Sequence, residues 1–107
     1  MEQRVWHAFY DQGIPVDFPW VERTLPGALD HAAANRPENT AIWFLNRRMT
    51  YRELKDQVDR LATALARLGV VKGTRVAIQM PNIPQTVIAY YAVLRAGGHV
   101  VMTNPLY

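Results

Sequence analysis

The stretch from Arg75 to Tyr107, RVAIQMPNIPQTVIAYYAVLRAGGHVVMTNPLY, decides the fold. Residues 75–80 form a short apolar run with β-branched side chains, which predicts a strand. Residues 84–96 carry an almost unbroken apolar run long enough for a buried helix, and residues 99–103 predict a second strand. A short helical crossover between two buried strands is typical of a parallel, right-handed βαβ unit. The sequence therefore predicts an α/β fold.

Both ends of the predicted central helix carry boundary signals. Asn82 is expected to cap the free amides at its start, with Pro84 in the first turn and Gln85 completing an N-cap/N3 pair. Gly97 and Gly98 follow the last turn and supply the left-handed C-terminal cap. These signals set the helix at 84–96.

Composition excludes several classes of protein. The chain has 107 residues, half of them hydrophobic and a fifth charged, which fits one folded domain at most. It has no cysteine, so disulfides, thiolate nucleophiles and cysteine-ligated metals are excluded. The N-terminus lacks the features of a signal peptide, and the longest apolar run is shorter than the ~20 residues that span a bilayer. We expect a cytoplasmic protein.

Charge is distributed unevenly along the chain. The net charge is +3, and no acidic residue follows Asp59. Five cations remain after that point: Arg60, Arg67, Lys72, Arg75 and Arg95. A basic face for nucleic acid or phosphate is one interpretation. The favoured one is a set of solvent-facing charges whose acidic partners lie beyond this chain, because the cations are spaced singly without interleaved aromatic residues. No nucleic-acid partner is expected.

Residues 1–23 show no helical or strand period, yet they hold five aromatic side chains. These are Trp6, Phe9, Tyr10, Phe18 and Trp20. Because disordered tails are poor in aromatics, we predict an extended arm anchored across a surface, with an aromatic cage for a ligand as the alternative. The surface belongs to the arm's own domain, to sequence beyond this chain or to a second subunit. The partial α/β domain then occupies 24–107.

Two elements are expected between the arm and residue 50. Thr24 can cap a helix over 25–36, which Pro37 ends. The apolar face of this helix comprises Leu25, Ala28, Leu29, Ala32 and Ala33. Residues 40–45 and 48–50 predict a short β-hairpin joined by a turn at Asn46 and Arg47.

The clearest local signal is the capping box formed by Thr50 and Glu53. The apolar residues that follow recur at intervals of three and four: Leu54, Val58, Leu61, Leu65 and Leu68. Gly69 ends this helix. Because burial of five such side chains does not offset the cost of ordering the segment, we expect a sheet beneath the helix; a coiled coil is the alternative.

None of these segments carries a recognisable catalytic constellation. The turn 81–84 after the first strand of the βαβ unit lacks the glycines of a dinucleotide site. The chain contains no serine, and no aspartate or glutamate follows Asp59. His7, His31 and His99 have no partner at ligand spacing, and Tyr90 and Tyr91 fit core packing. We assign no catalytic, cofactor-binding or metal-binding residue.

An ordered series of motifs over 24–107 nevertheless resembles the start of the adenylate-forming acyl-CoA synthetases, especially bacterial fatty acid–CoA ligases. The first motifs are MTYREL (49–54), LA (61–62), LGV (68–70) and KG (72–73) running into RVAI (75–78). The later ones are MPNIP (80–84), AVLRAGG (92–98) and NPLY (104–107). The resemblance implies the N-terminal portion of the layered α/β large domain of such an enzyme.

The resemblance also implies an enzyme several times longer than this chain, of which we expect this to be a fragment. Such enzymes use ATP and Mg²⁺ to convert a fatty acid, here a long-chain one, to an acyl-adenylate, and coenzyme A then takes the acyl group. The family's phosphate loop, its acidic ribose and metal motifs and its C-terminal lysine have no counterpart in this chain. We therefore expect the fragment alone to bind no cofactor and to be inactive.

Other classes of function stay open at this point. The chain could be a stand-alone protein-interaction module that reuses the scaffold, or a small nucleotide-responsive α/β domain. Because the strand at 100–102 would have an unpaired edge, we also expect self-association into a homo-oligomer. The acyl chain length and any peripheral membrane association of the full enzyme depend on residues beyond Tyr107.

Overall fold

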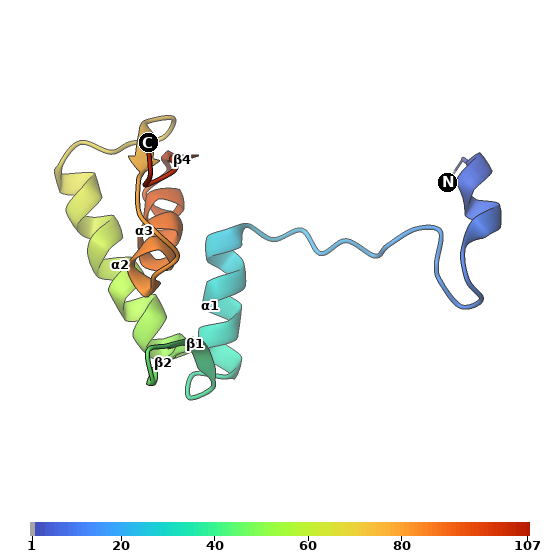
Figure 1. The fold of residues 1–107 in the computed structure, drawn as a ribbon, viewed down its shortest axis with the longest axis horizontal. Coiled ribbons are helices and arrows are strands. Elements are labelled where there is room, and N and C mark those ends of the chain that lie inside the picture. The colour runs from blue at the N-terminus through green and yellow to red at the C-terminus, as the bar shows by residue number, and fades with distance from the viewer. Residues whose placement is uncertain (1) are drawn as a thin grey trace.

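The computed structural model describes residues 2–107 and has the mixed α/β composition that the sequence predicts. A short 3-10 helix, η1 (Val5–Phe9), lies in the N-terminal arm. The first half of the body contains α1 (Leu25–Asn35), β1 (Thr40–Phe44), β2 (Arg47–Thr50) and α2 (Tyr51–Arg67). The second half contains β3 (Arg75–Ile78), α3 (Pro84–Arg95) and β4 (His99–Met102). The three long helices lie side by side, with the hairpin at one end and β3–β4 toward the other (Figure 1).

The βαβ unit is confirmed. β3 and β4 pair in parallel, in a register that runs from Arg75 opposite His99 to Ile78 opposite Met102. The end of α3 is a Schellman cap, in which the Gly98 amide donates to Val93 O at 2.9 Å and the Gly97 amide to Leu94 O at 3.0 Å. Gly97 has a φ of +90°, as the left-handed cap requires.

The start of α3 differs from the expected one. The N-cap residue is Ile83, whose side chain cannot accept a hydrogen bond, and Asn82 lies one residue too early to cap the helix. A residue in the first turn of the helix stabilises this turn instead. The buried Thr86 hydroxyl donates to Pro81 O at 2.5 Å. Pro84 at the first helical position reduces the need for a cap, since it has no amide proton.

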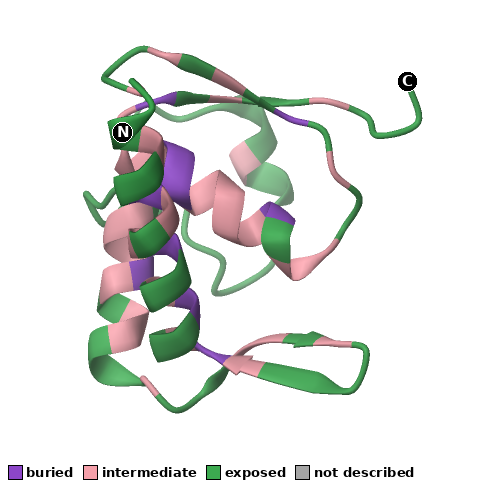
Figure 2. Ribbon diagram, turned by 90° about the vertical axis from the view of Figure 1, so that its left-hand side faces the viewer, coloured by how far each residue is buried: buried purple, intermediate pink, exposed green. Residues whose placement is uncertain are grey.

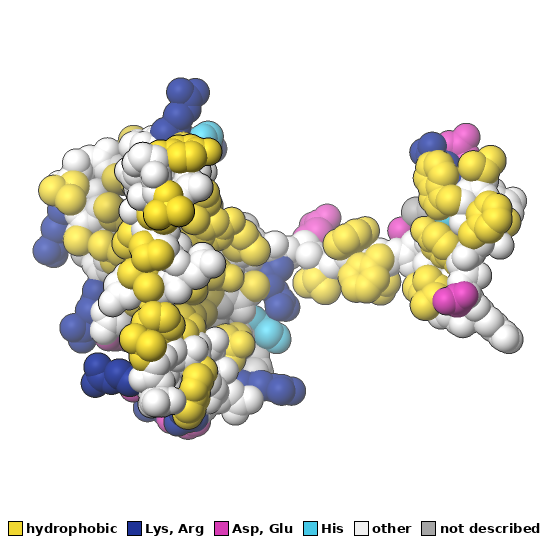
Figure 3. Space-filling view, viewed as in Figure 1, with side chains coloured by type: hydrophobic (Ala, Val, Ile, Leu, Met, Phe, Trp, Pro, Cys, Tyr) yellow, Lys and Arg dark blue, Asp and Glu magenta, His cyan; other side chains and the backbone are white. Residues whose placement is uncertain are grey.

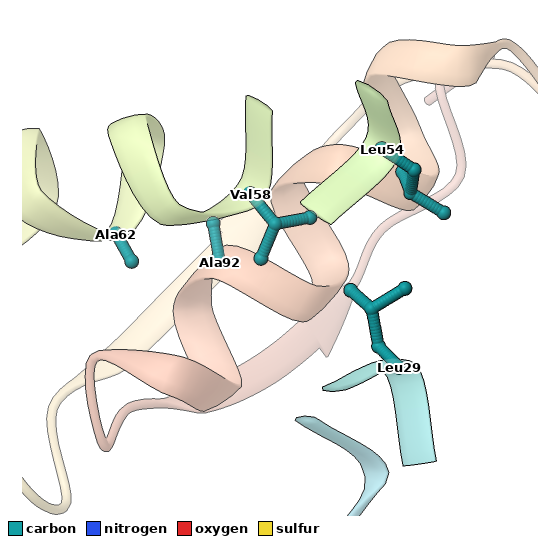
Figure 4. Packing of buried hydrophobic residues seen from close by; sticks show 5 residues of the cluster. All are labelled: Leu29, Leu54, Val58, Ala62 and Ala92. Atoms are coloured by element: carbon teal, nitrogen blue, oxygen red, sulfur yellow. The ribbon is translucent and has the colours of Figure 1, made fainter. Parts of the chain in front are cut away.

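The main core lies between helices. Its buried members are Leu29, Leu54, Val58, Ala62 and Ala92. Ala62 on α2 faces Ala92 on α3, and these small side chains let the two helices approach closely, while Leu29 reaches in from α1 (Figure 4). The expected sheet beneath α2 is therefore wrong: α2 packs on α3 and α1, which bury its apolar stripe instead.

The buried stripe of α2 is also shorter than the sequence pattern indicates. Leu54 and Val58 are 4% and 0% exposed, whereas Leu68 is 83% exposed at the C-cap. Buried positions alternate with exposed ones along the helices, as Figure 2 shows. Leu25, expected on the inner face of α1, is likewise exposed. In both helices the periodic series of apolar residues extends beyond the part of the helix that neighbouring elements cover.

The hairpin turns one residue earlier than expected. Phe44 pairs with Arg47, so that the two-residue turn comprises Leu45 and Asn46 rather than Asn46 and Arg47. Both turn residues have positive φ, 47° and 60°, as a type I′ turn requires. Leu45 lacks the local polar group that makes asparagine or aspartate tolerant of positive φ. The residue types therefore do not predict a turn at this position.

The capping box at the start of α2 is confirmed. The Glu53 amide donates to Thr50 Oγ1 at 3.2 Å, and the Thr50 amide donates to Glu53 Oε2 at 2.8 Å. Thr50→Ala should therefore lower the free energy of unfolding by about 1 kcal/mol, because a first-turn amide loses its acceptor. Urea denaturation measures this. Thr63→Ala, at an exposed position inside the same helix, is the control, and equal losses in the two variants would show that the cap contributes nothing.

The N-terminal arm stands away from the helices (Figure 1). Its large apolar side chains are exposed, with Phe9 at 86% and Trp20 at 81%. The short helix η1 departs from the expected extended conformation and is followed by irregular chain up to Thr24. Thr24 then caps α1 as predicted, accepting from the Gly27 amide at 3.0 Å.

Candidate functional site

In layered α/β proteins, ligands bind beyond the carboxyl ends of parallel strands, and for β3 this place is the turn at residues 79–83. In this turn the Thr86 hydroxyl donates a hydrogen bond to the Pro81 carbonyl, as described above. No glycine lies in this turn to let a phosphate approach the backbone. The residues present therefore do not fit ATP at this position.

A hollow of about 390 Å³ lies between the hairpin and the first turns of α2 and α3. Its lining residues are Ile42, Phe44, Arg47, Arg48, Met49, Glu53, Gln57, Pro84 and Gln85. Two of the charged residues in its wall, Arg48 and Glu53, already have structural partners. Arg48 donates to Thr40 Oγ1 at 2.6 Å and to the carbonyl of Glu38, and Glu53 completes the capping box. The hollow thus offers neither a nucleophile nor an acid–base pair.

The strongest electrostatic cluster lies between α1, α2 and α3. Arg95 donates to both carboxylate oxygens of Asp30, at 2.6 and 3.2 Å. Its Nε lies 3.0 Å from Asp59 Oδ1, an ion pair whose N–H is not aligned for a hydrogen bond. Lys55 also pairs with Asp59, at 2.5 Å. One cation on α3 thus joins carboxylates on the other two helices.

The cluster shifts the pKa of two of its members. The hydrogen bonds from Arg95 hold the pKa of Asp30 below its ordinary value, and the same contacts raise the pKa of Arg95. Both shifts keep the groups charged, as in a structural ion pair, whereas a general acid or base needs a pKa near neutrality. We interpret the cluster as a helix clamp.

This cluster corrects the interpretation of the basic second half. The acidic partners of Arg95 lie within this chain, on α1 and α2. Arg60 likewise pairs with Asp56 at 3.0 Å, one turn earlier on the same helix. The sequence gives little sign of the Arg95 contacts, because Asp30 lies 65 residues away. A single arginine in the last turn of an otherwise apolar helix was the only indication.

The remaining polar residues do not gather into a site. Within residues 2–107, no three histidine or acidic side chains lie close enough to hold a metal ion. His31 lies on the exposed side of α1, as expected, where the Asn35 amide approaches its Nδ1 at 3.3 Å. None of the helices in the described part of the chain combines the length and the hydropathy of a membrane span.

The surface that stands out is the free edge of β4, which we call the β4 edge. Within residues 2–107, β4 pairs only with β3. The amides on either side of the pairing, His99 and Thr103, donate to Thr74 O and Ile78 O at 2.7 and 2.9 Å. Because backbone groups alternate along a strand, those of Val100 and Met102 point to the free side. A sheet of two strands is smaller than most proteins use, so the β4 edge is positioned to accept another strand.

The class of the protein follows from comparison of its sequence with known families. The sequence profile of the AMP-binding enzyme family matches residues 29–107, which includes α3, both parallel strands and most of α1. The chain belongs to this family of adenylate-forming enzymes, as the ordered motifs predicted.

Two curated relatives align with nearly the whole chain. A long-chain-fatty-acid–CoA ligase of Bacillus subtilis (strain 168) is 46% identical over 105 residues, which cover 98% of this chain and 19% of the relative. The long-chain-fatty-acid–CoA ligase of Salmonella typhimurium is 36% identical over 107 residues, again 98% of this chain and 19% of the relative. This chain therefore spans about a fifth of the length of these relatives.

A solved structure supports the same fold. The N-terminal subdomain of Klebsiella oxytoca NpsA, in complex with 3-hydroxybenzoyl-AMSN, superposes with a TM-score of 0.77 and 30% identity, covering 79% of this chain and 22% of that one. The observed hairpin and parallel strand pair therefore match the start of the N-terminal subdomain of adenylate-forming enzymes. That no catalytic, cofactor or metal residue lies in this chain stays a prediction.

Proposed function

We propose that this chain is the N-terminal part of a fatty acid–CoA ligase that acts on long-chain fatty acids. The observation that carries the proposal is the 46% identity to the Bacillus subtilis ligase over 98% of this chain. That alignment takes in the aromatic arm, which lies outside the family profile. Similarity beyond the common domain favours an acyl-CoA ligase over adenylating enzymes in general.

The proposed reaction has two steps. The fatty acid carboxylate attacks the α-phosphorus of ATP, which forms acyl-AMP and releases pyrophosphate. The thiol sulfur of coenzyme A then attacks the acyl carbonyl, loses its proton and displaces AMP to give the thioester. Activation is required because a carboxylate oxygen is a poor leaving group, whereas AMP is a good one.

This chain's own part in the reaction is to build the scaffold. The helix clamp and the alanine contact between α2 and α3 fix the position of the βαβ unit, and the β4 edge is open for further strands. The turn after β3 does not fit ATP, and we propose no chemical step for the residues of this chain. A cytoplasmic location, and any peripheral contact of the full enzyme with membranes, stay predictions.

The isolated chain should neither bind ATP tightly nor form acyl-adenylate, because the turn after β3 cannot hold a phosphate. Calorimetric titration with ATP and an assay for fatty-acid-dependent pyrophosphate release measure this. An ATP dissociation constant in the micromolar range would favour the small nucleotide-responsive domain instead. Pyrophosphate release by the chain alone would show that residues 1–107 contain a catalytic site.

A chimera tests the ligase proposal itself. This chain would replace the aligned first fifth of the Bacillus subtilis enzyme, and formation of acyl-CoA from a long-chain fatty acid would be measured. The chimera should remain active, because the graft supplies the same scaffold. A graft with Val93→Asp, which buries a charge at a position only 1% exposed, is the inactive control. A folded chimera without activity would favour the stand-alone interaction module.

A further inference from the structure

The connection from the end of α2 to the start of β3 presents apolar and cationic side chains together. Leu68 and Val71 are 83% and 62% exposed. Arg67, Lys72 and Arg75 are also exposed and form no ion pair with the described residues. We call residues 67–75 the cationic loop.

Hydrogen bonds hold the cationic loop in a defined conformation. The Val71 amide donates to Thr74 Oγ1 at 3.1 Å, and the Thr74 amide donates to Val71 O at 3.0 Å, which closes a turn. The Gly73 amide donates to Gly97 O at 3.0 Å, so this turn is joined to the end of α3. Val70, just before the turn, is half-buried. The exposure of Val71 is therefore a property of an ordered turn.

The cationic loop lies at the amino end of the parallel sheet. β3 begins at Arg75, and His99 at the start of β4 lies beside it in the register. Further strands of the sheet would pair along its edges, which leaves the strand ends uncovered. Ligands of layered α/β proteins bind beyond the opposite, carboxyl ends. A partner at the cationic loop would therefore leave the ligand-binding side of the sheet accessible.

The charge of the cationic loop is not compensated by neighbouring acids. No acidic residue lies between 60 and 107, whereas residues 67–75 contain three cations. The nearest acids along α2, Asp56 and Asp59, already form ion pairs. The loop lies at the end of the body away from the hairpin (Figure 1), and Figure 3 shows Lys and Arg side chains projecting from that end.

We propose that the cationic loop docks on a negatively charged lipid bilayer surface. Each Lys or Arg near such a surface strengthens binding about fivefold, and the two aliphatic side chains gain by leaving water for the boundary of the acyl region. A nucleic acid would match the cations, but it would leave Leu68 and Val71 against phosphates or water. The inference goes beyond the proposed function and does not rest on it, because the loop lies away from the ligand-binding side of the sheet.

Cosedimentation of the whole chain with vesicles tests the contribution of charge. Vesicles with about a third phosphatidylglycerol in phosphatidylcholine should bind the chain at least about tenfold more tightly than pure phosphatidylcholine, and high salt should remove the difference. Lys72→Glu combined with Arg75→Glu should weaken this binding at least about twentyfold. Arg36→Glu combined with Arg47→Glu makes the same charge change at two exposed arginines toward the hairpin end, and it should weaken binding less than about threefold.

A fluorescent label tests the contribution of the apolar side chains. Because the chain has no cysteine, Val71→Cys can carry an environment-sensitive dye at that position alone. Its emission should shift to the blue on phosphatidylglycerol vesicles, and polyuridylate RNA should leave it unchanged. Leu45→Cys, at a position 78% exposed in the hairpin turn, is the control and should show no shift with either.

Four results would overturn the proposal. A chain that does not bind phosphatidylglycerol vesicles would exclude a membrane surface as the partner. Equal effects of the two charge-reversed pairs would show that net charge, and not the cationic loop, causes binding. A dye shift with RNA but not with vesicles would favour a nucleic acid.

The fourth result comes from the ligase chimera, in which the rest of the enzyme is present. Charge reversal at Lys72 and Arg75 should weaken vesicle binding of the chimera as it does in the chain alone. No effect there would show that the rest of the enzyme covers the loop. Because acyl-CoA formation by the chimera is measured without vesicles, failure of this proposal can be distinguished from failure of the proposed function.

Discussion

Leu54→Ala should lower the free energy of unfolding by about 3 kcal/mol, the middle of the range for leucine-to-alanine changes in a core. Leu54 is 4% exposed and belongs to the cluster in which α1, α2 and α3 meet. Truncation removes apolar contact with more than one helix and leaves a cavity that rigid neighbours fill only in part. The midpoint of urea denaturation at fixed protein concentration measures the loss.

Leu68→Ala is the matched control, because the two leucines belong to the same periodic series. Leu68 is 83% exposed, so its truncation should change the free energy of unfolding by less than about 0.5 kcal/mol. Equal losses at the two positions would mean that α2 is covered along its whole length. That result would contradict a core confined to the contact of three helices.

Arg95→Met should lower the free energy of unfolding by about 2 kcal/mol. Removal of one partner from a buried ion pair costs about 3–5 kcal/mol, whereas exposed pairs contribute about 0–1 kcal/mol. The Arg95 side chain is 24% exposed and that of Asp30 is 42% exposed, so the expected value lies between these limits. Methionine keeps the apolar stem and removes the charge. A double-mutant cycle with Asp30→Asn isolates the pair, and additive losses would show that it contributes nothing.

The same pair predicts a dependence on pH. Arg95 lowers the pKa of Asp30 in the folded state. The contribution of the Arg95–Asp30 ion pair to the free energy of unfolding is therefore complete above the ordinary pKa of 3.8. It is lost as the pH falls below that value, through the lower folded pKa. The difference in stability between wild type and Arg95→Met should therefore shrink under acid conditions. A difference that stays constant down to pH 2 would contradict the assignment.

Elements with local signals could be predicted from the sequence. The capping box at Thr50, the cap at Thr24 and the glycine end of α3 each depend on residues within one or two turns. Parallel pairing of β3 and β4 followed from the short helical crossover between two apolar runs. In each case the physical cause lies in a few neighbouring side chains or amides.

Features that depend on distant contacts could not be predicted in this way. Periodicity indicates which face of α2 is apolar, but it does not show that helices cover that face, or that the cover ends before Leu68. The Arg95 clamp joins residues that are far apart in sequence. The turn at Leu45 required a positive φ that its composition does not favour.

The function was predicted from a different kind of signal than the local structure. No single motif carried the function, and the assignment came from a series of motifs in a fixed order, which the family profile then confirmed. Within residues 2–107, the unpaired edge of β4 was expected from the sequence.

The most direct measurement is the rate of fatty-acid-dependent pyrophosphate release by the ligase chimera that carries this chain. If these residues form the N-terminal scaffold of a fatty acid–CoA ligase, the rate should lie within about tenfold of that of the unmodified enzyme and should require both ATP and fatty acid. A folded chimera that releases pyrophosphate no faster with fatty acid than without it would contradict the account.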